Sequence, residues 1–161
     1  MNKRSEILTI MILFILIAPL GLLAHCEIPC GIYNDKLRID LLKEHITTIE
    51  KSMTQITELS AQGEKNYNQL VRWVGNKEEH ANQFQHIVTQ YFMTQRLKTP
   101  VAGDDKEAYL KKLSLLHEML VLAMKSKQTT DTENCKKLRE TVDSFSSVYF
   151  SKDDLDHMKE H

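Results

Sequence analysis

The 161-residue chain has few of the residues that form turns, with five glycines and three prolines. This scarcity excludes collagen-like and linker-dominated proteins. Charge of one sign is also lacking, because 21 basic residues nearly balance 22 acidic ones. Proteins that bind nucleic acid usually carry a basic excess, so we expect no nucleic-acid partner. The chain has three cysteines, and its length is sufficient to bury a core without a disulfide framework.

The sequence also lacks the metal-binding pattern of di-iron helical bundles. Those proteins carry Glu-x-x-His pairs that point into the bundle. No histidine of this chain has a glutamate three positions before it. We therefore expect an apolar helical core without a di-iron centre.

The chain is rich in leucine, isoleucine, lysine, glutamate and glutamine, and these residues favour helices. No segment alternates apolar and polar residues as a half-buried strand does. Apolar residues instead recur three and four positions apart along four segments, which places them on one face of each helix. The sequence predicts an all-α, antiparallel up-and-down four-helix bundle over residues 34–150, followed by a polar C-terminal tail at 151–161.

The four predicted helices are separated by Gly63, by the break at residues 99–103 and by the polar stretch near residue 130. The predicted caps are Asn34 or Asp35, Asp104 or Asp105, and Thr130 or Asp131. The predicted inward residues are Leu42, Ile46, Ile49, Met53 and Ile56; Leu70, Val74, Ala81, Phe84, Val88 and Tyr91, with Lys77 as a polar exception; Tyr109, Leu113, Leu116, Leu120 and Ala123; and Cys135, Leu138, Val142, Phe145 and Tyr149. At such a position Cys135 is expected to be a buried, unreactive thiol.

Residues 1–24 differ from the rest of the chain. Lys3 and Arg4 precede an apolar run that reaches Ala24, and polarity returns at His25. A basic start, an apolar stretch and a small residue at its end are typical of a cleavable, signal-peptide-like leader. We predict cleavage after Ala24 by a leader-processing protease, so that the chain meets the membrane only transiently. An uncleaved membrane anchor is the alternative, because the run approaches the length that spans a bilayer.

Cleavage there would give a chain that begins with closely spaced metal donors. His25 would offer its α-amine and imidazole, Cys26 its backbone amide and thiol, and Cys30 a second thiol. The amine and the thiol flank the Cys26 amide, so the three donors form two fused chelate rings around one ion once that amide is deprotonated. Pro29 and Gly31 supply the bend that returns Cys30 to the same ion.

Two nitrogens and two sulfurs arranged in this way lie near one plane. A planar set of nitrogen and sulfur donors suits Ni(II) or Cu(II), whereas zinc prefers a tetrahedron. The His25 imidazole stays free to bind as an axial ligand. Thiolate and amidate donors stabilise a higher oxidation state, which brings the Ni(III)/Ni(II) couple within biological reach.

A Cys-x-x-x-Cys pair on its own is a weak signal. Outside the cytosol it also forms small disulfide loops, and it occurs in copper-handling proteins. The alternative hypothesis is therefore a secreted helical-bundle binding or copper-handling module, with a Cys26–Cys30 disulfide or metal site and no turnover. Residues 25–33, which we call the hook, form a far more specific pattern than this pair alone.

The hook resembles the N-terminus of nickel-containing superoxide dismutases, which share the pattern His-Cys-x-x-Pro-Cys-Gly-x-Tyr. The residues that match it are His25, Cys26, Pro29, Cys30, Gly31 and Tyr33. The resemblance covers most of the chain after the leader. It continues at residues 38–40, 70–74, 77–81 and 90–92.

This resemblance implies a four-helix bundle that assembles as a homohexamer, with one nickel ion per subunit. It also implies conversion of two superoxide ions and two protons to O₂ and H₂O₂. His25 would bind nickel through its amine and, in the oxidised state, its imidazole. Cys26 would bind through its backbone nitrogen and sulfur, and Cys30 through its sulfur. Tyr33 would stand near the open face and limit access to small anions.

Two positions depart from the family pattern. The third hook residue is commonly aspartate, and here it is Glu27, whose side chain is longer. The family also uses an acid to orient the axial imidazole, and Asp40 is our candidate for that role. Glu27, Asp40 and Pro29 are the residues expected to support the metal ligands.

The leader favours export to the periplasm or out of the cell. Superoxide is an anion, so an exported enzyme would meet it on the side of the membrane where it is present. Removal of the leader inside the cell by a dedicated protease, which gives a cytoplasmic enzyme, is the alternative. Taken together, the sequence predicts a nickel superoxide dismutase, an oxidoreductase whose substrate is superoxide and whose main partner is further copies of itself.

Overall fold

The computed structural model describes residues 33–151 of the chain. Over these residues it contains helices and turns and no strand, and none of the helices is long and apolar enough to span a membrane. The elements are α2 (Asp35–Ala61), the 3₁₀ turn η1 (Glu64–Asn66), α3 (Tyr67–His86), the π-helix η2 (Ile87–Arg96), α4 (Lys106–Gln128) and α5 (Glu133–Tyr149). The predicted all-α four-helix bundle is confirmed for this part of the chain.

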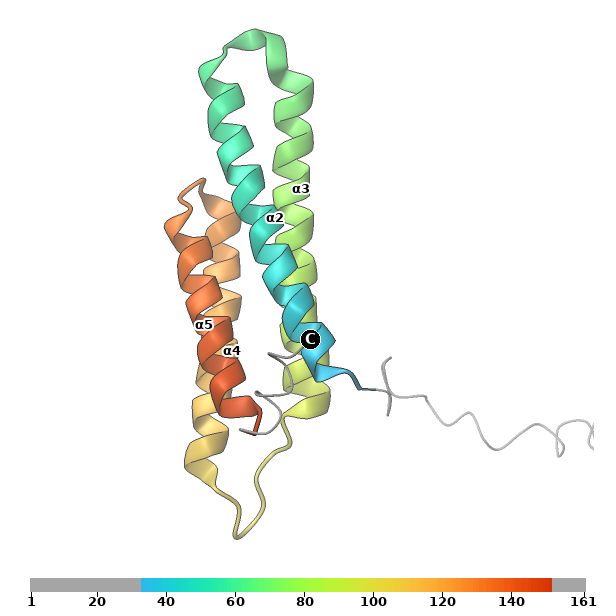
Figure 1. Cartoon of the computed structure of the whole chain (residues 1–161), viewed down its shortest axis with the longest axis vertical. Helices are drawn as coiled ribbons and strands as arrows, with labels where there is room; N and C mark the ends of the chain where they lie inside the picture. The colour runs from blue at the N-terminus through green and yellow to red at the C-terminus, as the bar shows by residue number, and fades with distance from the viewer. Residues whose placement is uncertain (1–32, 152–161) are drawn as a thin grey trace, which may run out of the picture.

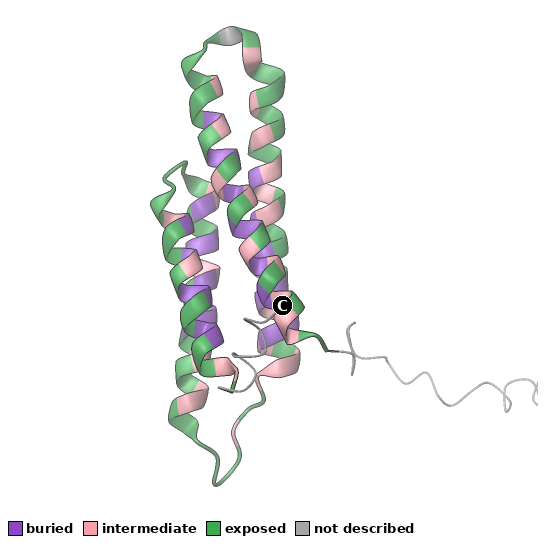
Figure 2. Ribbon diagram, in the orientation of Figure 1, coloured by how far each residue is buried: buried purple, intermediate pink, exposed green. Residues whose placement is uncertain are grey.

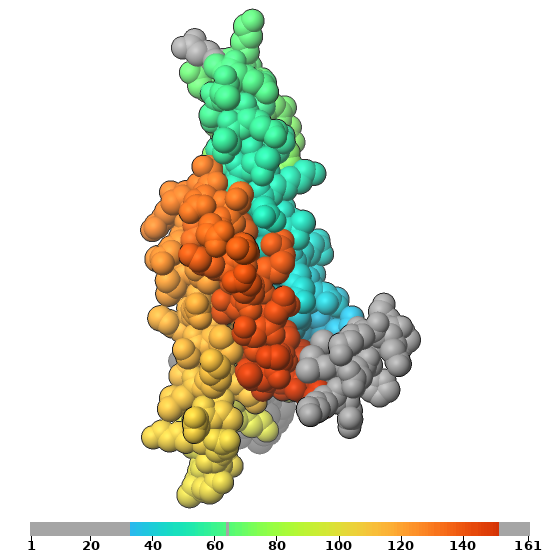
Figure 3. Space-filling view, turned by 60° about the vertical axis from the view of Figure 1, so that its left-hand side comes forward, coloured from blue at the N-terminus to red at the C-terminus, as the bar shows by residue number. Residues whose placement is uncertain are grey.

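The four long helices form two antiparallel hairpins (Figure 1). Helix α2 packs along α3, which continues directly into η2, and α4 packs along α5. The α4–α5 hairpin lies against one half of the α2–α3 hairpin, where α2 contacts α5 and α3 contacts α4. The other end of the α2–α3 hairpin extends beyond α4 and α5, which leaves that end without a third helix (Figures 1 and 3).

Buried residues lie mainly where the two hairpins face each other (Figure 2). The largest fully buried side chains are Phe84, Phe92, Phe145, Ile39, Leu42, Ile46, Ile49, Met53, Leu116, Met119, Leu138 and Val88. The apolar stripe predicted on α2 is confirmed, because all five of its residues are buried. On α5 four of the five predicted residues are buried, and Tyr149 is partly buried against the same core.

The helix starts show which of the predicted caps are used. Asn34 caps α2, since its Oδ1 accepts a hydrogen bond from a backbone N–H of the first turn at 3.0 Å. The side chain of Asp35 is therefore available for other contacts. Asp105 caps α4 by accepting two backbone N–H groups, each at 3.0 Å. Helix α5 begins after Thr132, one residue beyond the later of its two predicted caps, and Asp131 Oδ1 accepts a backbone N–H of its first turn at 3.0 Å.

The prediction for the beginning of α3 is wrong. The sequence predicts Leu70 and Val74 in the core, but Leu70 is partly exposed and Val74 is 40% exposed. Both lie toward the projecting end of the α2–α3 hairpin, whose turn at Gly63 has a φ of 76° that suits glycine. A residue at this end of α3 has one neighbouring helix instead of two, so only part of its surface is covered.

The buried face of α4 is broader than predicted. Leu116 and Ala123 are buried as expected, but Tyr109, Leu113 and Leu120 are partly exposed. The additional buried residues are Leu115, Met119, Leu122 and Ser126. Helix α4 contacts both α3 and α5, so its burial extends to residues that the single predicted stripe does not include.

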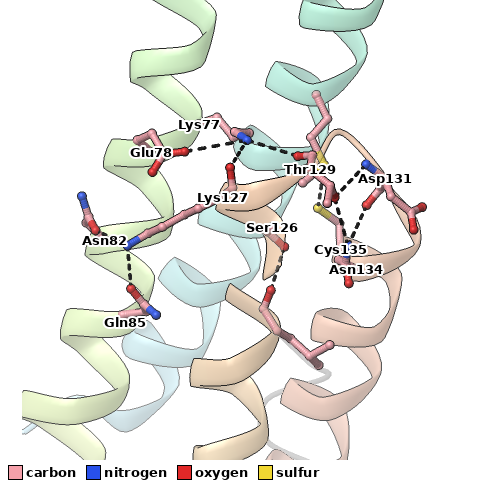
Figure 4. Close-up of polar contacts among 12 residues, drawn as sticks. Lys77, Glu78, Asn82, Gln85, Ser126, Lys127, Thr129, Asp131, Asn134 and Cys135 are labelled. Atoms are coloured by element: carbon pink, nitrogen blue, oxygen red, sulfur yellow. Dashed lines mark hydrogen bonds and ion pairs between the residues drawn. The ribbon is translucent and has the colours of Figure 1, made fainter. Parts of the chain in front are cut away.

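Lys77, the polar exception on the predicted α3 stripe, is 5% exposed. Its Nζ donates to the carbonyl oxygens of Lys127 at 2.5 Å and Thr129 at 3.1 Å, and it forms an ion pair with Glu78 at 3.7 Å (Figure 4). These carbonyls belong to the C-terminal end of α4, where the last C=O groups have no partner within the helix. Lys77 therefore attaches the end of α4 to α3.

Cys135 is fully buried, as predicted, close to the Lys77 contact (Figure 4). Its Sγ lies 3.7 Å from the Sδ of Met53. Burial raises the pKa of the Cys135 thiol to about 11. The group is thus protonated at neutral pH, and a protonated thiol is a poor nucleophile and metal ligand.

Candidate metal centre

The predicted metal donors come just before the first residue that the structure describes. The predicted positions outside the described residues are the leader at 1–24, His25, Cys26, Glu27, Pro29 and Cys30, and most of the tail, at 152–161. Within residues 33–151, no three His, Cys, Asp or Glu side chains are grouped so that they could hold a metal ion. The hook ligands therefore stay a prediction, and the structure describes the part of the bundle that the hook joins.

Tyr33 is the last residue of the hook, and its side chain packs on η2. Its ring meets the ring of Tyr91 edge-on, with centroids 6.0 Å apart and an interplanar angle of 76°. The guanidinium carbon of Arg96 lies 4.3 Å from the centroid of the Tyr33 ring, which is a cation–π contact. The side chain remains 40% exposed. Tyr33 is thus held where the hook meets the bundle, with part of its surface open to solvent.

The carboxylate of Asp35, two residues further on, accepts hydrogen bonds from three side chains. Oδ1 accepts from the Tyr91 hydroxyl at 2.6 Å and from Arg96 Nε at 2.8 Å. Oδ2 accepts from Arg96 Nη2 at 2.6 Å and from the Tyr149 hydroxyl at 2.8 Å. Two parallel bonds from a guanidinium to a carboxylate form a bidentate pair, which is stronger than a single contact. We call Asp35, Tyr91, Arg96 and Tyr149 the Asp35 cluster; it joins α2, η2 and α5.

The hydrogen bonds in the Asp35 cluster determine which groups are charged. Burial alone would raise the pKa of Asp35, but hydrogen bonds from Arg96, Tyr91 and Tyr149 outweigh it, so that pKa lies below its ordinary value. Burial and the bond to Asp35 raise the pKa of Tyr91 and raise that of Tyr149 to about 12. The same carboxylate raises the pKa of Arg96. Near neutral pH the carboxylate is therefore ionised, and each partner keeps the proton that it donates.

The π-helix η2 explains how Tyr91 and Arg96 both reach Asp35. These residues are five positions apart, and in an α-helix of about 3.6 residues per turn they would point to different sides. Hydrogen bonds in a π-helix join residues five apart, which brings such residues closer to one face. The end of η2 shows this pattern, since Leu97 N donates to Phe92 O at 2.8 Å. The wider winding therefore favours the contact of both side chains with one carboxylate.

Asp40, the predicted partner of the axial imidazole, lies on the exposed side of α2. Its Oδ2 accepts from Lys36 Nζ at 3.1 Å, and 54% of its side chain is exposed. Among the described residues, the structure brings Tyr33 and not Asp40 to the Asp35 cluster. Orientation of the imidazole by Asp40 stays a prediction, because His25 lies outside the described part of the chain.

A second arginine lies near the Tyr91 ring. The guanidinium carbon of Arg38 is 5.1 Å from the centroid of the Tyr91 ring. The charge of Arg96 is balanced by Asp35, whereas Arg38 forms no ion pair with any residue between 33 and 151. A positive charge on the surface of a protein attracts small anions.

Sequence reasoning missed the Asp35 cluster. It considered Asp35 as a helix cap and placed Tyr91 and Tyr149 among the core residues. A signal was present, because a tyrosine at a core position needs a hydrogen-bond partner for its hydroxyl. Arg96 carried no such signal, since it stands at the end of its helical segment outside any motif.

Comparison with known proteins identifies the family. The family model for nickel-containing superoxide dismutase matches residues 21–153, which include the hook and all four helices. Searches of curated proteins and of solved structures found no match to the chain. The matched region contains the complete His-Cys-x-x-Pro-Cys-Gly-x-Tyr pattern, and the described part of it folds as a four-helix bundle. The chain therefore belongs to the family of nickel-containing superoxide dismutases.

Proposed function

We propose that this enzyme, an oxidoreductase that acts on superoxide, holds its nickel ion in the hook. His25 binds through its α-amine and imidazole, Cys26 through its amide nitrogen and thiolate, and Cys30 through its thiolate. The donor set would suit the metal, because amine, amide and thiolate groups together are donors that Ni(II) accepts. One such site forms on each subunit.

The chemistry that nickel supplies when bound is a one-electron couple, Ni(III)/Ni(II), through which one superoxide ion is oxidised to O₂ and a second, with two protons, is reduced to H₂O₂. The residues of the chain hold the donors and control access to them. Asp40 orients the His25 imidazole, while Glu27 and Pro29 shape the hook. Tyr33 limits the open face to small anions.

Two described features near Tyr33 support this account of access. The ring of Tyr33, the last residue of the hook, lies against Tyr91 of η2. The guanidinium of Arg38 lies over the Tyr91 ring, and it has no ion-pair partner in the described part of the chain. A positive charge at this place increases the rate at which an anionic substrate arrives.

The observation that carries the proposal is the family match over residues 21–153, together with the complete hook pattern within it. The first test is native mass spectrometry of protein purified from its own host, combined with a dismutation assay. We expect a chain that begins at His25, one nickel ion per chain and an assembly of six copies. A retained leader, or a metal-free monomer with Cys26 joined to Cys30, would instead support a secreted binding module.

A second test addresses the α-amine of His25. One glycine added before His25 moves the amine away from the metal and leaves every side chain of the mature chain unchanged. We expect this variant to lose nickel binding and dismutation together. The matched control is one glycine added after His161, which leaves the hook intact. If the N-terminally extended chain keeps both properties, the proposed ligand set is wrong.

We also propose that the leader directs export and that the enzyme works in the periplasm or outside the cell. The basic start, apolar run and small residue at position 24 support this location. Cell fractionation of the native host tests it. Recovery of the enzyme in the cytoplasm with the leader removed would show that a dedicated intracellular protease acts instead.

A further inference from the structure

We propose that Arg96 is a positioning residue for Tyr33 and, through Tyr33, for the hook. This inference rests on the proposed function of the hook, because it assigns a role at the same site. Its evidence, however, comes from contacts within the described part of the chain. Arg96 contacts Asp35 through Nε and Nη2, and its guanidinium carbon lies over the Tyr33 ring.

The first step is that Arg96 itself is held in one place. Its Nε and Nη2 bond the two oxygens of Asp35 at 2.8 and 2.6 Å, and the arginine side chain is 28% exposed. A planar guanidinium in a bidentate pair has little freedom to rotate. Asp35 is held in turn by the hydroxyls of Tyr91 and Tyr149. The position of the guanidinium is therefore determined by α2, η2 and α5 together.

The second step is that Tyr33 has two described ring contacts, and both come from η2. The face of its ring meets Arg96 at 4.3 Å, and Tyr91 meets it edge-on at 6.0 Å between centroids. The rest of the side chain is open, with 40% exposure. Without the guanidinium the ring would keep the edge contact with Tyr91 alone. Loss of an exposed cation–π contact lowers the population of the packed ring about two- to five-fold.

The third step connects the ring to the hook. Asn34 alone separates Tyr33 from the first residue of α2, and both Asn34 and Asp35 are anchored by their side chains. The backbone on the C-terminal side of Tyr33 therefore has little freedom, and the ring contact restrains the residue itself. Together they restrict the direction in which the hook leaves the bundle. Arg96 thus acts on the metal site through its contact with Tyr33.

The test follows the Tyr33 ring directly, by ¹⁹F NMR of the mature enzyme labelled with 3-fluorotyrosine. The chain has five tyrosines, and the Tyr33 resonance is assigned with Tyr33→Phe. Spectra of the enzyme as purified and after removal of the metal separate ring position from nickel content. The difference in shift between H₂O and D₂O reports how exposed the ring is.

Two substitutions at Arg96 distinguish positioning from charge. Arg96→Gln removes both the bidentate pair and the cation, and we expect the Tyr33 resonance to move toward that of a free tyrosine in both metal states. Arg96→Lys keeps the charge without the planar fork, and we expect an intermediate shift. If Arg96→Gln does not fold, as judged by circular dichroism, the shift of the Tyr33 resonance in Arg96→Lys is used as the test.

Two further arginines provide controls. Arg139→Gln removes the ion pair between Arg139 and Glu50, which are 3.2 Å apart and have side chains 37% and 38% exposed. We expect this variant to leave the Tyr33 resonance and the activity unchanged. Arg38→Gln removes the neighbouring cation, which contacts Tyr91 and not Tyr33. We expect it to lower kcat/KM at low ionic strength while the Tyr33 resonance stays in place.

A Tyr33 resonance that moves in both Arg96 variants, with and without metal, supports the proposal even if nickel proves to bind elsewhere. A Tyr33 resonance that stays in place while those of Tyr91 and Tyr149 move would show that Arg96 has a structural role only, and would overturn it. An equal movement of Tyr33 in Arg38→Gln would overturn it as well, because general charge would then be the cause.

Discussion

Arg96 and Asp35 are 61 positions apart in the sequence, yet Nη2 of the arginine lies 2.6 Å from Oδ2 of the aspartate. The pair connects the start of α2 with the end of η2, and Tyr149 adds the end of α5 to the same carboxylate. The ends of three helices therefore meet at Asp35, which lies two positions after the last residue of the hook. A hook that must hold a metal in a defined geometry benefits from such a rigid attachment.

We expect Asp35→Asn to destabilise the bundle. The amide keeps one acceptor oxygen but loses the charge, which leaves the cation of Arg96 partly buried without its partner. The expected loss is about 2–3 kcal/mol in the free energy of unfolding. Urea unfolding of the metal-free protein measures it. The matched control is Asp143→Asn. Asp143 forms an ion pair with Lys43, and the two side chains are 58% and 44% exposed. We expect this substitution to change the free energy of unfolding by less than about 0.5 kcal/mol. Equal effects of the two changes would contradict the role of the cluster.

We expect stability to fall as the pH is lowered through the range where histidine titrates, because of the pair formed by His45 and His80. Their Nδ1 atoms are 2.9 Å apart, so one ring donates and the other accepts. Burial first, and then the charge of His80, lowers the pKa of His45, while Glu44 and Glu79 oppose the shift. The folded state thus binds the proton less tightly than the unfolded state. The contribution of His45 to the stability of the folded state is complete above the pKa of histidine in the unfolded chain, about 6.5. It is lost as the pH falls below that value.

Urea unfolding between pH 7.5 and pH 5 measures this dependence, and His80→Gln tests its source. Glutamine can still exchange a hydrogen bond with His45 but cannot acquire the second positive charge. We expect the variant to lose less stability on acidification than the parent. His117→Gln, at an exposed position on α4, is the control and should follow the parent curve. A parent-like slope in His80→Gln would show that the pair is not responsible.

We expect the three thiols to differ sharply in reactivity once the metal is removed. Burial raises the pKa of Cys135 to about 11, so this thiol should react with Ellman's reagent only after unfolding. Cys26 and Cys30 should react quickly in the folded protein, or form a disulfide with each other in air. Thiol counts before and after addition of guanidinium, with mass spectrometry of the oxidised product, measure this. Hook thiols that survive air for days would weaken the assignment of the hook.

We expect Lys77→Met to loosen the end of α4. Methionine is similar in length to lysine and is apolar. It fills the same space but removes the hydrogen bonds to the carbonyls of Lys127 and Thr129. The expected cost is about 1–3 kcal/mol, with faster amide hydrogen exchange in the last turn of α4. The matched control is Lys136→Met. The side chain of Lys136 is 64% exposed and forms an ion pair with Glu133. Unchanged exchange in Lys77→Met would show that the lysine does not hold this turn.

The outcome for individual residues shows how far sequence reasoning reached. The stripe of Leu42, Ile46, Ile49 and Met53 is correct, because helical spacing and burial on one face are local properties of a segment. Val74 has the same spacing on its own segment and yet is 40% exposed. It lies on the part of α3 before Lys77, where the end of α4 is bound, so α2 is its one neighbouring helix. Periodicity indicates which face of a helix is apolar, and the lengths and offsets of the neighbouring helices decide how much of it is covered.

The sequence by itself determined the four helices, the family and the hook pattern of His25, Cys26 and Cys30, since chelation by nearly consecutive residues and helical periodicity both depend on short-range spacing. Only the tertiary structure decided the partners of Asp35, the π-helical winding that brings Tyr91 and Arg96 to it, and the carbonyls that Lys77 binds. Those contacts join residues about 50 to 114 positions apart. They arise from the packing of one helix on another, and no local spacing encodes such packing.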